Sequence, residues 1–323
     1  MDVRARIAAE YRRFGEIDAR PRSPFYDRVA HAVAEDHRIL GLLAAMPVAK
    51  QQPNLLFGAV RYLYGTPATP EEFLALVHEH SHEILGVMAT RTTQTNEPAR
   101  CSTLLPALAL LPPPLALLEV GASAGLCLLP DRYEFDYGAR RIPASEYLGT
   151  DPPVFWCSPG AQTPLPRHNL DVVWRAGLDL NPIDLRDPRE VQWLEALVWP
   201  GEEYRIPRLR AACEIARRDP PRVLVGDLRN DLASLAAQAP PEATLVVFHT
   251  AVLSYVPDAA QRAAFARTVG ELGATWIANE GPEFIPGISE EVARERPPGQ
   301  CLLCVDRQPT AWTDPHGTWV QWR

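Results

Sequence analysis

The feature that most constrains the fold is a change of pattern at residues 112–114, which are three consecutive prolines. After them, short apolar runs alternate with amphipathic segments, and this alternation is typical of βαβ units around a parallel sheet. We therefore predict an α/β domain over residues 111–323, with a Rossmann-like, doubly wound and mostly parallel sheet. The predicted strands cover residues 115–120, 171–178, 222–225, 243–248 and 275–278, and residues 301–305 and 319–322 are predicted to form a closing hairpin.

The first 110 residues follow helical spacing instead. Thr69, Pro70 and Glu72 supply an N-cap, a proline for the first turn and a capping-box glutamate. Apolar residues then recur every three or four positions, and no segment alternates as a strand would. We predict an N-terminal all-helical domain, or cap, over residues 1–110.

The interval between Gly125 and Asp179 is longer than a helical crossover requires. Within it, Tyr133, Phe135 and Tyr137 alternate with acidic residues before a glycine. This pattern predicts a β-hairpin insertion around residues 130–170.

Composition narrows the function classes. The net charge of -8 is unsuited to binding a phosphate backbone, so nucleic acid is not expected as the main partner. Prolines interrupt the longest uncharged run, the amino terminus has no secretory signal, and six scattered cysteines form no disulfide framework. We expect a cytoplasmic protein that acts on a small molecule without a membrane partner; the oligomeric state is left open.

The strand at 115–120 runs into a glycine-rich turn, and residues 117–125 read LLEVGASAG. This segment resembles the first motif of class I S-adenosylmethionine (SAM)-dependent methyltransferases, in which an acidic residue precedes GxGxG. The resemblance implies that Glu119, Gly121 and Gly125 bind SAM, because a Cβ at the glycines would hold the cofactor away from the backbone. Ser123 replaces the middle glycine of the motif and is included among the expected SAM contacts.

The ends of the next strands carry further resemblances to the same family. In GLDLNP (residues 177–182), the resemblance implies that Asp179 binds the ribose hydroxyls. In VLVGDL (223–228), it implies that Asp227 and Leu228 contact the adenine. Residues 246–257 resemble the fourth strand and the loop that abuts the methyl group and the substrate, and Tyr255 in this loop is a tentative substrate contact. A SAM-dependent methyltransferase acting on an unknown small molecule is our leading hypothesis.

Methyl transfer from a sulfonium mainly requires alignment and, for an OH or NH acceptor, removal of a proton. His249, at the carboxyl end of a predicted strand, is the first candidate for the general base, and Glu280 is the second. A hydrogen-bonded core histidine is the alternative interpretation of His249.

A polar segment containing Gln94, Thr95, Asn96, Glu97 and Arg100 precedes the prolines. It is either an interdomain loop or, through its last three named residues, a contributor to the substrate pocket.

Two other functions remain open. Residues 121–125 also spell GxSxG, the nucleophile elbow of α/β-hydrolases, with Ser123 as nucleophile and His249 or His316 as base. The helical segment upstream and the neighbouring Glu119 weaken this interpretation. A Rossmann-like module that binds a ligand without catalysis is the third hypothesis.

No metal site is predicted. His78, Glu79 and His82 match HExxH, with Glu97 as a conceivable third ligand, but no extended metalloprotease pattern follows. We interpret these histidines as a structural cluster. The CxxC at Cys301 and Cys304 lies in a predicted strand without a second pair.

The chain as a whole resembles an uncharacterised bacterial family, domain-of-unknown-function family 2332. The resemblance covers nearly the full length and includes TQTNEPARC (93–101), GASAGLCLLPDRYEFDYG (121–138) and GLDLNPIDL (177–185). It implies no particular activity.

Overall fold

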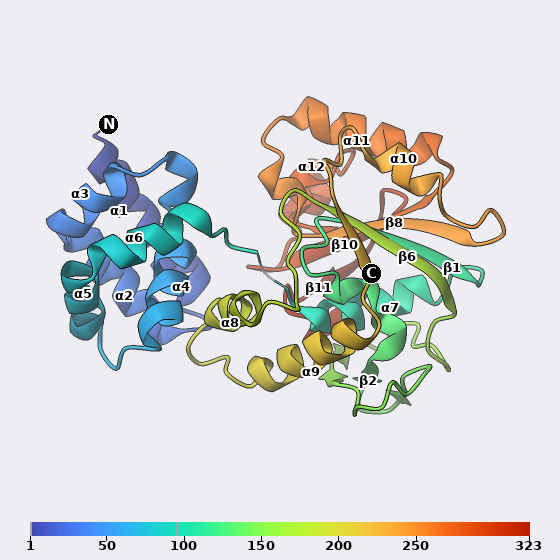
Figure 1. Cartoon of the computed structure of the whole chain (residues 1–323). Coiled ribbons are helices and arrows are strands. Elements are labelled where there is room, and N and C mark those ends of the chain that lie inside the picture. Colours follow the sequence, from blue (N-terminus) through green and yellow to red (C-terminus); the bar gives the residue numbers. More distant parts are fainter. Residues whose placement is uncertain (1, 95) are drawn as a thin grey trace. The chain divides into compact units, whose positions relative to one another are not determined.

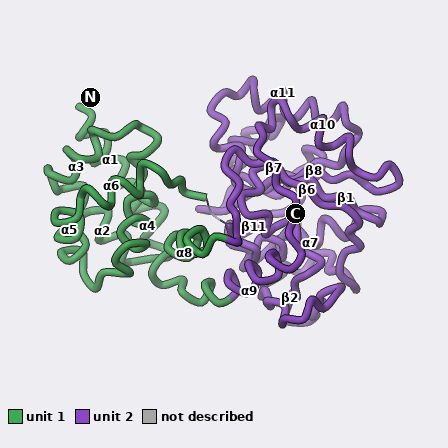
Figure 2. Tube along the Cα trace, viewed as in Figure 1, with its two compact units in different colours: residues 1–95, 187–207 green, residues 96–186, 208–323 purple. Residues whose placement is uncertain are grey.

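The chain divides into two compact units in a computed structural model that describes residues 2–94 and 96–323. Unit 1 comprises residues 1–95 and 187–207, and unit 2 comprises residues 96–186 and 208–323 (Figure 2). The division therefore lies at 95/96 instead of the predicted 110/111, and a later segment returns to the first unit. No helix in the described part of the chain combines the length and apolarity needed to cross a membrane.

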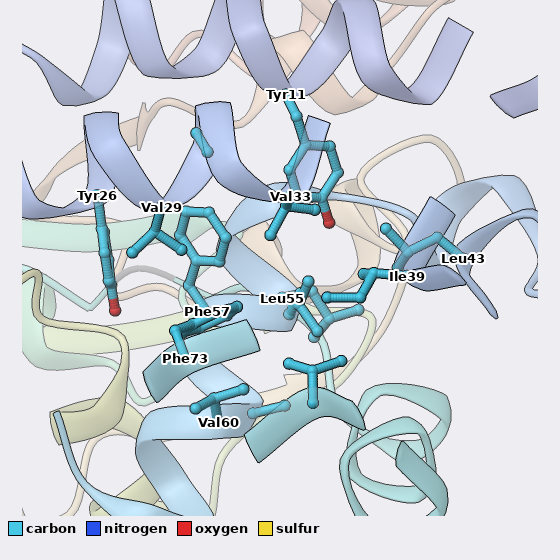
Figure 3. Close-up of a cluster of buried hydrophobic side chains, with 14 of the residues drawn as sticks. Tyr11, Tyr26, Val29, Val33, Ile39, Leu43, Leu55, Phe57, Val60 and Phe73 are labelled. Atoms are coloured by element: carbon cyan, nitrogen blue, oxygen red, sulfur yellow. The ribbon is translucent and has the colours of Figure 1, made fainter. Parts of the chain in front are cut away.

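Unit 1 is helical throughout its described residues, as predicted. Its core gathers aromatic and branched side chains, with Phe57 in edge-on contact with Tyr11 and Phe73 (Figure 3). The N-cap prediction is confirmed, because the Glu72 backbone N–H donates to Thr69 Oγ1 at 3.2 Å. The Glu72 carboxylate accepts the N–H of Ala68 instead of that of Thr69, so the capping box is not complete. The elements are α1 (Val3–Arg13), η1 (Phe14–Ala19), α2 (Pro24–Glu35), α3 (His37–Ala44), η2 (Val48–Lys50), α4 (Pro53–Tyr64), α5 (Pro70–Glu79), α6 (Ser81–Thr90) and α8 (Pro188–Ala196).

Trp193 of α8 explains why residues 187–207 belong to unit 1. Its side chain is buried in the unit 1 core, and its indole N–H donates to the Thr92 carbonyl at 3.0 Å. Gly58 leaves room for it, since a Cβ there would lie 3.2 Å from the indole ring. The segment therefore buries its apolar face in unit 1, although its neighbours in sequence belong to unit 2.

Unit 2 is built on a nine-stranded mixed sheet in the order β5-β12-β11-β10-β9-β8-β1-β6-β7 (Figure 1). The five strands β7-β6-β1-β8-β9 are parallel, and the progression along the chain reverses between β1 and β8. This arrangement confirms the predicted mostly parallel α/β fold. The strands are β1 (Leu115–Val120), β5 (Ser158–Pro159), β6 (Val172–Asp179), β7 (Arg222–Val225), β8 (Thr244–Thr250), β9 (Thr275–Glu280), β10 (Cys301–Val305), β11 (Gln308–Thr313) and β12 (Trp319–Trp322).

Helices cover both faces of this sheet (Figure 1). On one face, Leu118 and Val120 of β1 join an apolar cluster with Phe265 of α11 and Leu235 of α10. Because strand side chains alternate, Glu119 points to the opposite face. The helical elements are η3 (Pro98–Arg100), α7 (Cys101–Leu108), η4 (Leu126–Leu128), η5 (Pro130–Arg132), α9 (Arg205–Arg218), α10 (Leu232–Ala236), η6 (Leu253–Tyr255), α11 (Ala259–Glu271), η7 (Pro282–Phe284) and α12 (Glu290–Arg294).

The predicted insertion contains a small sheet in the order β3-β2-β4, made of β2 (Glu134–Asp136), β3 (Arg141–Ile142) and β4 (Val154–Trp156). Strands β2 and β3 form the predicted antiparallel hairpin, with Phe135 opposite Ile142. Tyr133, Phe135 and Tyr137 are all buried, as their alternation indicated.

One local prediction in unit 2 was wrong. The predicted closing hairpin does not pair β10 with β12, because β11 lies between them. The polar residues and Pro309 of β11 concealed this strand in the sequence. The glycine turn after β1 leads into η4 and η5. Pro130, five positions after Gly125, prevents a helix from continuing there.

Candidate functional site

The turn after β1 has the left-handed backbone that its glycines suggest. Gly121 and Gly125 have φ of 70° and 71°, and Ser123 has φ of 52°. A Cβ at Gly121 would lie 2.4 Å from Val252 Cγ2, and one at Gly125 would lie 2.6 Å from Pro221 Cγ. Packing within the protein therefore accounts for both glycines, so their presence alone does not indicate a cofactor.

Asp179 lies at the carboxyl end of β6, the strand beside β1. Its Oδ2 accepts the backbone N–H of Ser123 at 2.8 Å, and its Oδ1 accepts that of Asn181 at 2.8 Å. The carboxylate is therefore within reach of a ligand that also touches the β1 turn.

The carboxyl end of β7 lies beside that of β6 in the sheet. The Gly226 N–H donates to the Asp179 carbonyl at 3.0 Å, which fixes Asp227 and the half-buried Leu228 beside β6. Asp227 accepts from Arg229 Nε at 2.8 Å, and this guanidinium lowers the pKa of the carboxyl. The adenine contact predicted for Asp227 would therefore compete with Arg229.

Two apolar side chains near Asp179 are open to solvent. Leu180 is 65% exposed and Val225 is 78% exposed. Val225 pairs in register with Asp179, so both side chains share one face of the sheet. The carboxyl edge of β6 and β7 thus combines a carboxylate with exposed apolar surface.

Asn96 is bonded directly to the β1 turn. Its Oδ1 accepts the Ala124 N–H at 3.0 Å, and its Nδ2 donates to Ser123 Oγ at 2.6 Å. Of the polar segment, Thr95 lies outside the described residues, and residues from Asn96 onward belong to unit 2. The segment therefore lies at the division between the units, as an interdomain loop would, and Asn96 also contacts the β1 turn. A contribution to the substrate pocket stays a prediction.

These contacts do not fit a hydrolase elbow. The Ser123 hydroxyl is bonded to an amide, not to a histidine, and Asn96 occupies the Ala124 N–H that would form the oxyanion hole. A carboxylate, Asp179, is bonded to the Ser123 N–H, where it would oppose a developing oxyanion.

Arg100 is a buried cation, with a side chain that is 8% exposed. Its Nη1 donates to the carbonyl and hydroxyl of Thr250 at the end of β8, and its Nε donates to the Pro315 carbonyl. Within residues 2–94 and 96–323, no carboxylate pairs with Arg100 and Nη2 makes no hydrogen bond. Buried charges are normally paired, so this guanidinium has unused capacity for an anion.

Glu119 is a buried acid on the same face of the sheet. It pairs in register with Phe248, two residues before Thr250, and its Oε2 has no hydrogen-bond partner among the described atoms. Burial, with smaller contributions from Cys127 and Asp179, raises the pKa of Glu119 well above its ordinary value, although Arg100 opposes the shift. Arg100, which contacts the end of β8, and Glu119 of β1 therefore both have unused hydrogen-bonding capacity. They lie at the adjacent strands where the order of strands reverses.

The raised pKa of Glu119 has a measurable effect on stability. The folded protein keeps a proton that the unfolded chain releases above pH 4.5, the ordinary pKa, so the free energy of unfolding falls as pH rises from there. Relative to Glu119→Gln, we expect the wild type to lose up to ~1.4 kcal/mol per pH unit. Urea unfolding of both proteins from pH 4 to 8 measures this difference; parallel pH profiles would show that Glu119 is ionised when folded.

The structure does not support the catalytic roles predicted for His249 and Glu280. Both are fully buried, and His249 Nδ1 lies 2.6 Å from Glu280 Oε1. The indole N–H of Trp276 donates to His249 Nε2 at 3.0 Å. Both ring nitrogens are therefore engaged on the apolar-cluster face of the sheet, opposite Glu119, and no lone pair is left for a substrate proton.

Glu280 has a structural role in the same place. Its Oε1 also accepts the backbone N–H groups of Val252 and Leu253, at 2.7 and 3.1 Å. It thereby fixes the chain that turns away from β8 and presses Val252 against Gly121. Tyr255, further along this turn, is 68% exposed and remains a tentative substrate contact.

No metal site emerges in the described part of the chain. The HExxH spacing is interrupted because α5 ends at Glu79 and α6 begins at Ser81, so His78 and His82 do not share a continuous helix. His78 is instead bonded to Asp36 at 2.8 Å, and His80 stacks on Tyr64. Contacts with Asp36 and Tyr64 fit the interpretation of these histidines as a structural cluster.

The family model described as "Uncharacterized protein conserved in bacteria (DUF2332)" matches residues 8–322. The chain belongs to this family. No curated protein and no solved structure matches the chain. The matched residues span both units, so the family model includes the helical unit as well as the sheet unit.

Proposed function

We propose that unit 2 binds SAM at the carboxyl ends of β7, β6, β1 and β8, and transfers its methyl group to a small molecule. The observation that carries the proposal is Arg100, a buried guanidinium without a carboxylate partner among the described residues. In an open α/β sheet, ligands bind outside the carboxyl ends of the strands where the strand order reverses. Arg100 and Glu119 lie at that position.

The pair fits an α-amino acid group. Arg100 offers Nη2 to a carboxylate, and Glu119 offers its unpartnered Oε2 to an ammonium. A bound ammonium favours the ionised form of Glu119, so binding would release a proton from a carboxyl whose pKa is raised in the free protein. SAM carries this zwitterionic group at one end. Both side chains are buried, so binding would require local movement of the chain that covers them.

The neighbouring strand ends fit the nucleoside. Asp179 is the carboxylate that the resemblance assigns to the ribose hydroxyls, and it lies against the β1 turn through its bond to the Ser123 N–H. The exposed side chains of Leu180 and Val225 offer apolar surface to a purine. The amino acid end would then lie at β1 and β8 and the nucleoside at β6 and β7.

The protein's part in methyl transfer would be alignment. Because His249 and Glu280 are engaged in the core, transfer would proceed without either of them as a base. An acceptor that is already nucleophilic, such as a carboxylate or a thiolate, needs only to be held in line with the methyl group.

The test is calorimetric titration of the full chain with SAM and S-adenosylhomocysteine. Because charge-assisted hydrogen bonds contribute ~1.5–3 kcal/mol each, we expect Asp179→Asn to weaken binding by about 10- to 100-fold. Asp184→Asn is the matched control, since Asp184 is exposed and paired with Arg186, and it should bind as the wild type does. Absence of binding to the wild type would reject the proposal.

Transfer of a labelled methyl group separates the enzyme from a ligand-binding module. We expect label to move from SAM to a small acceptor in an extract freed of protein. Binding that persists without any transfer would favour the non-catalytic Rossmann-like module over the methyltransferase.

A further inference from the structure

Two cysteines that the proposed function does not use lie against each other in unit 2. Cys101 opens α7, and Cys127 is the middle residue of η4. The Cys101 thiol lies 3.7 Å from the Cys127 carbonyl, and the Cys127 thiol lies 3.5 Å from the Glu97 carbonyl. The Cys101 thiol thus reaches the backbone of Cys127, and this contact between residues 26 positions apart makes the two cysteines neighbours in the fold.

We propose that Cys101 and Cys127 form a reversible disulfide when the protein meets a peroxide. The two residues come from elements that already hold each other, because Asn96 binds the β1 turn and Glu97 accepts from Cys127. The bond would link the start of α7, directly after Arg100, to η4, two residues after Gly125. This inference is independent of SAM binding, because it concerns the thiols alone.

The surroundings assign different roles to the two sulfurs. Cys127 is 7% exposed whereas Cys101 has no exposed surface, so a small peroxide reaches Cys127 first. The hydrogen bond from Cys101, helped by the charge of Arg100, lowers the pKa of Cys127, and burial raises that of Cys101. Cys127 is therefore the attacking thiolate and Cys101 the resolving thiol.

The reaction balances with hydrogen peroxide as the oxidant. The Cys127 thiolate attacks one peroxide oxygen, the O–O bond breaks, and a sulfenic acid and hydroxide form. The Cys101 sulfur then attacks the Cys127 sulfur, the S–O bond breaks, and water leaves with the thiol proton. In total, two thiols and one peroxide give one disulfide and two waters, and dithiothreitol reverses the result.

The experiment treats the reduced full chain with hydrogen peroxide, alkylates it in denaturant and maps its peptides by mass spectrometry. The chain has six cysteines, so we expect six alkylated thiols before oxidation and four afterwards, with one cross-linked Cys101–Cys127 peptide that dithiothreitol removes. This measurement needs no variant. Six alkylated thiols after oxidation, a different pairing, or sulfinic acid at Cys127 without a cross-link would overturn the proposal.

Variants test the order of the two steps. Cys101→Ser lacks the resolving thiol, so we expect a dimedone-reactive sulfenic acid to accumulate at Cys127 after peroxide. Cys304→Ser is the matched control, because it removes another buried cysteine and should leave the cross-link unchanged. Dimedone labelling of Cys101 in Cys127→Ser, with none at Cys127 in Cys101→Ser, would contradict the assignment of roles.

Discussion

His249→Ala is expected to lower the free energy of unfolding by ~4 kcal/mol, the largest loss of stability that we predict for any substitution. The truncation leaves a cavity in the apolar cluster and removes the partner of the Trp276 indole N–H. It also removes one of the donors to the Glu280 carboxylate, which is fully buried. Urea unfolding of unliganded wild type and variant measures the difference.

Comparison with two other variants shows whether the effect is specific. His249→Asn retains a donor for Glu280, so we expect its free energy of unfolding to lie between that of the wild type and that of the alanine variant. His168→Ala changes an exposed histidine of the same unit and should alter stability by less than ~0.5 kcal/mol. A His249→Ala protein that is as stable as the wild type but has lost methyl transfer would restore the catalytic assignment.

Arg100→Met is expected to weaken SAM binding by about 100-fold while leaving the free energy of unfolding within ~1 kcal/mol of the wild type. The methionine removes the donor proposed for the ligand carboxylate. It also removes a buried cation that has no carboxylate partner in the described chain, so the lost hydrogen bonds to Thr250 and Pro315 are offset by a lower desolvation penalty. Calorimetry and urea unfolding give the two quantities.

Arg132→Met is the control for the loss of a guanidinium outside the proposed site. The carboxylates bonded to Arg132, Asp219 and Glu146, are 36% and 59% exposed, so the loss of these solvent-screened pairs costs about 1 kcal/mol of stability or less. We expect its SAM affinity to match that of the wild type. Equal SAM affinity of the Arg100 and Arg132 variants would remove Arg100 from the proposed site.

The sequence by itself determined the parts of the fold that depend on neighbouring residues. The five parallel strands follow from short apolar runs, and the start of α11 follows from Asp258, whose side chain accepts the Ala260 N–H. Gly273 ends that region with a φ of 65°, as a residue after a helix often does. These signals are local, because caps and strand alternation act within a few residues.

Only the tertiary structure decided which polar residues are available for chemistry. His249 and Arg100 are both polar residues at a sheet edge in the sequence, yet the first is satisfied by Trp276 and Glu280 and the second lacks a carboxylate partner among the described residues. The glycines of the β1 turn are likewise required by close packing against Val252 and Pro221, which are distant in sequence. Burial and hydrogen-bond partners arise from contacts between distant segments, and periodicity in one sequence carries no information about those contacts.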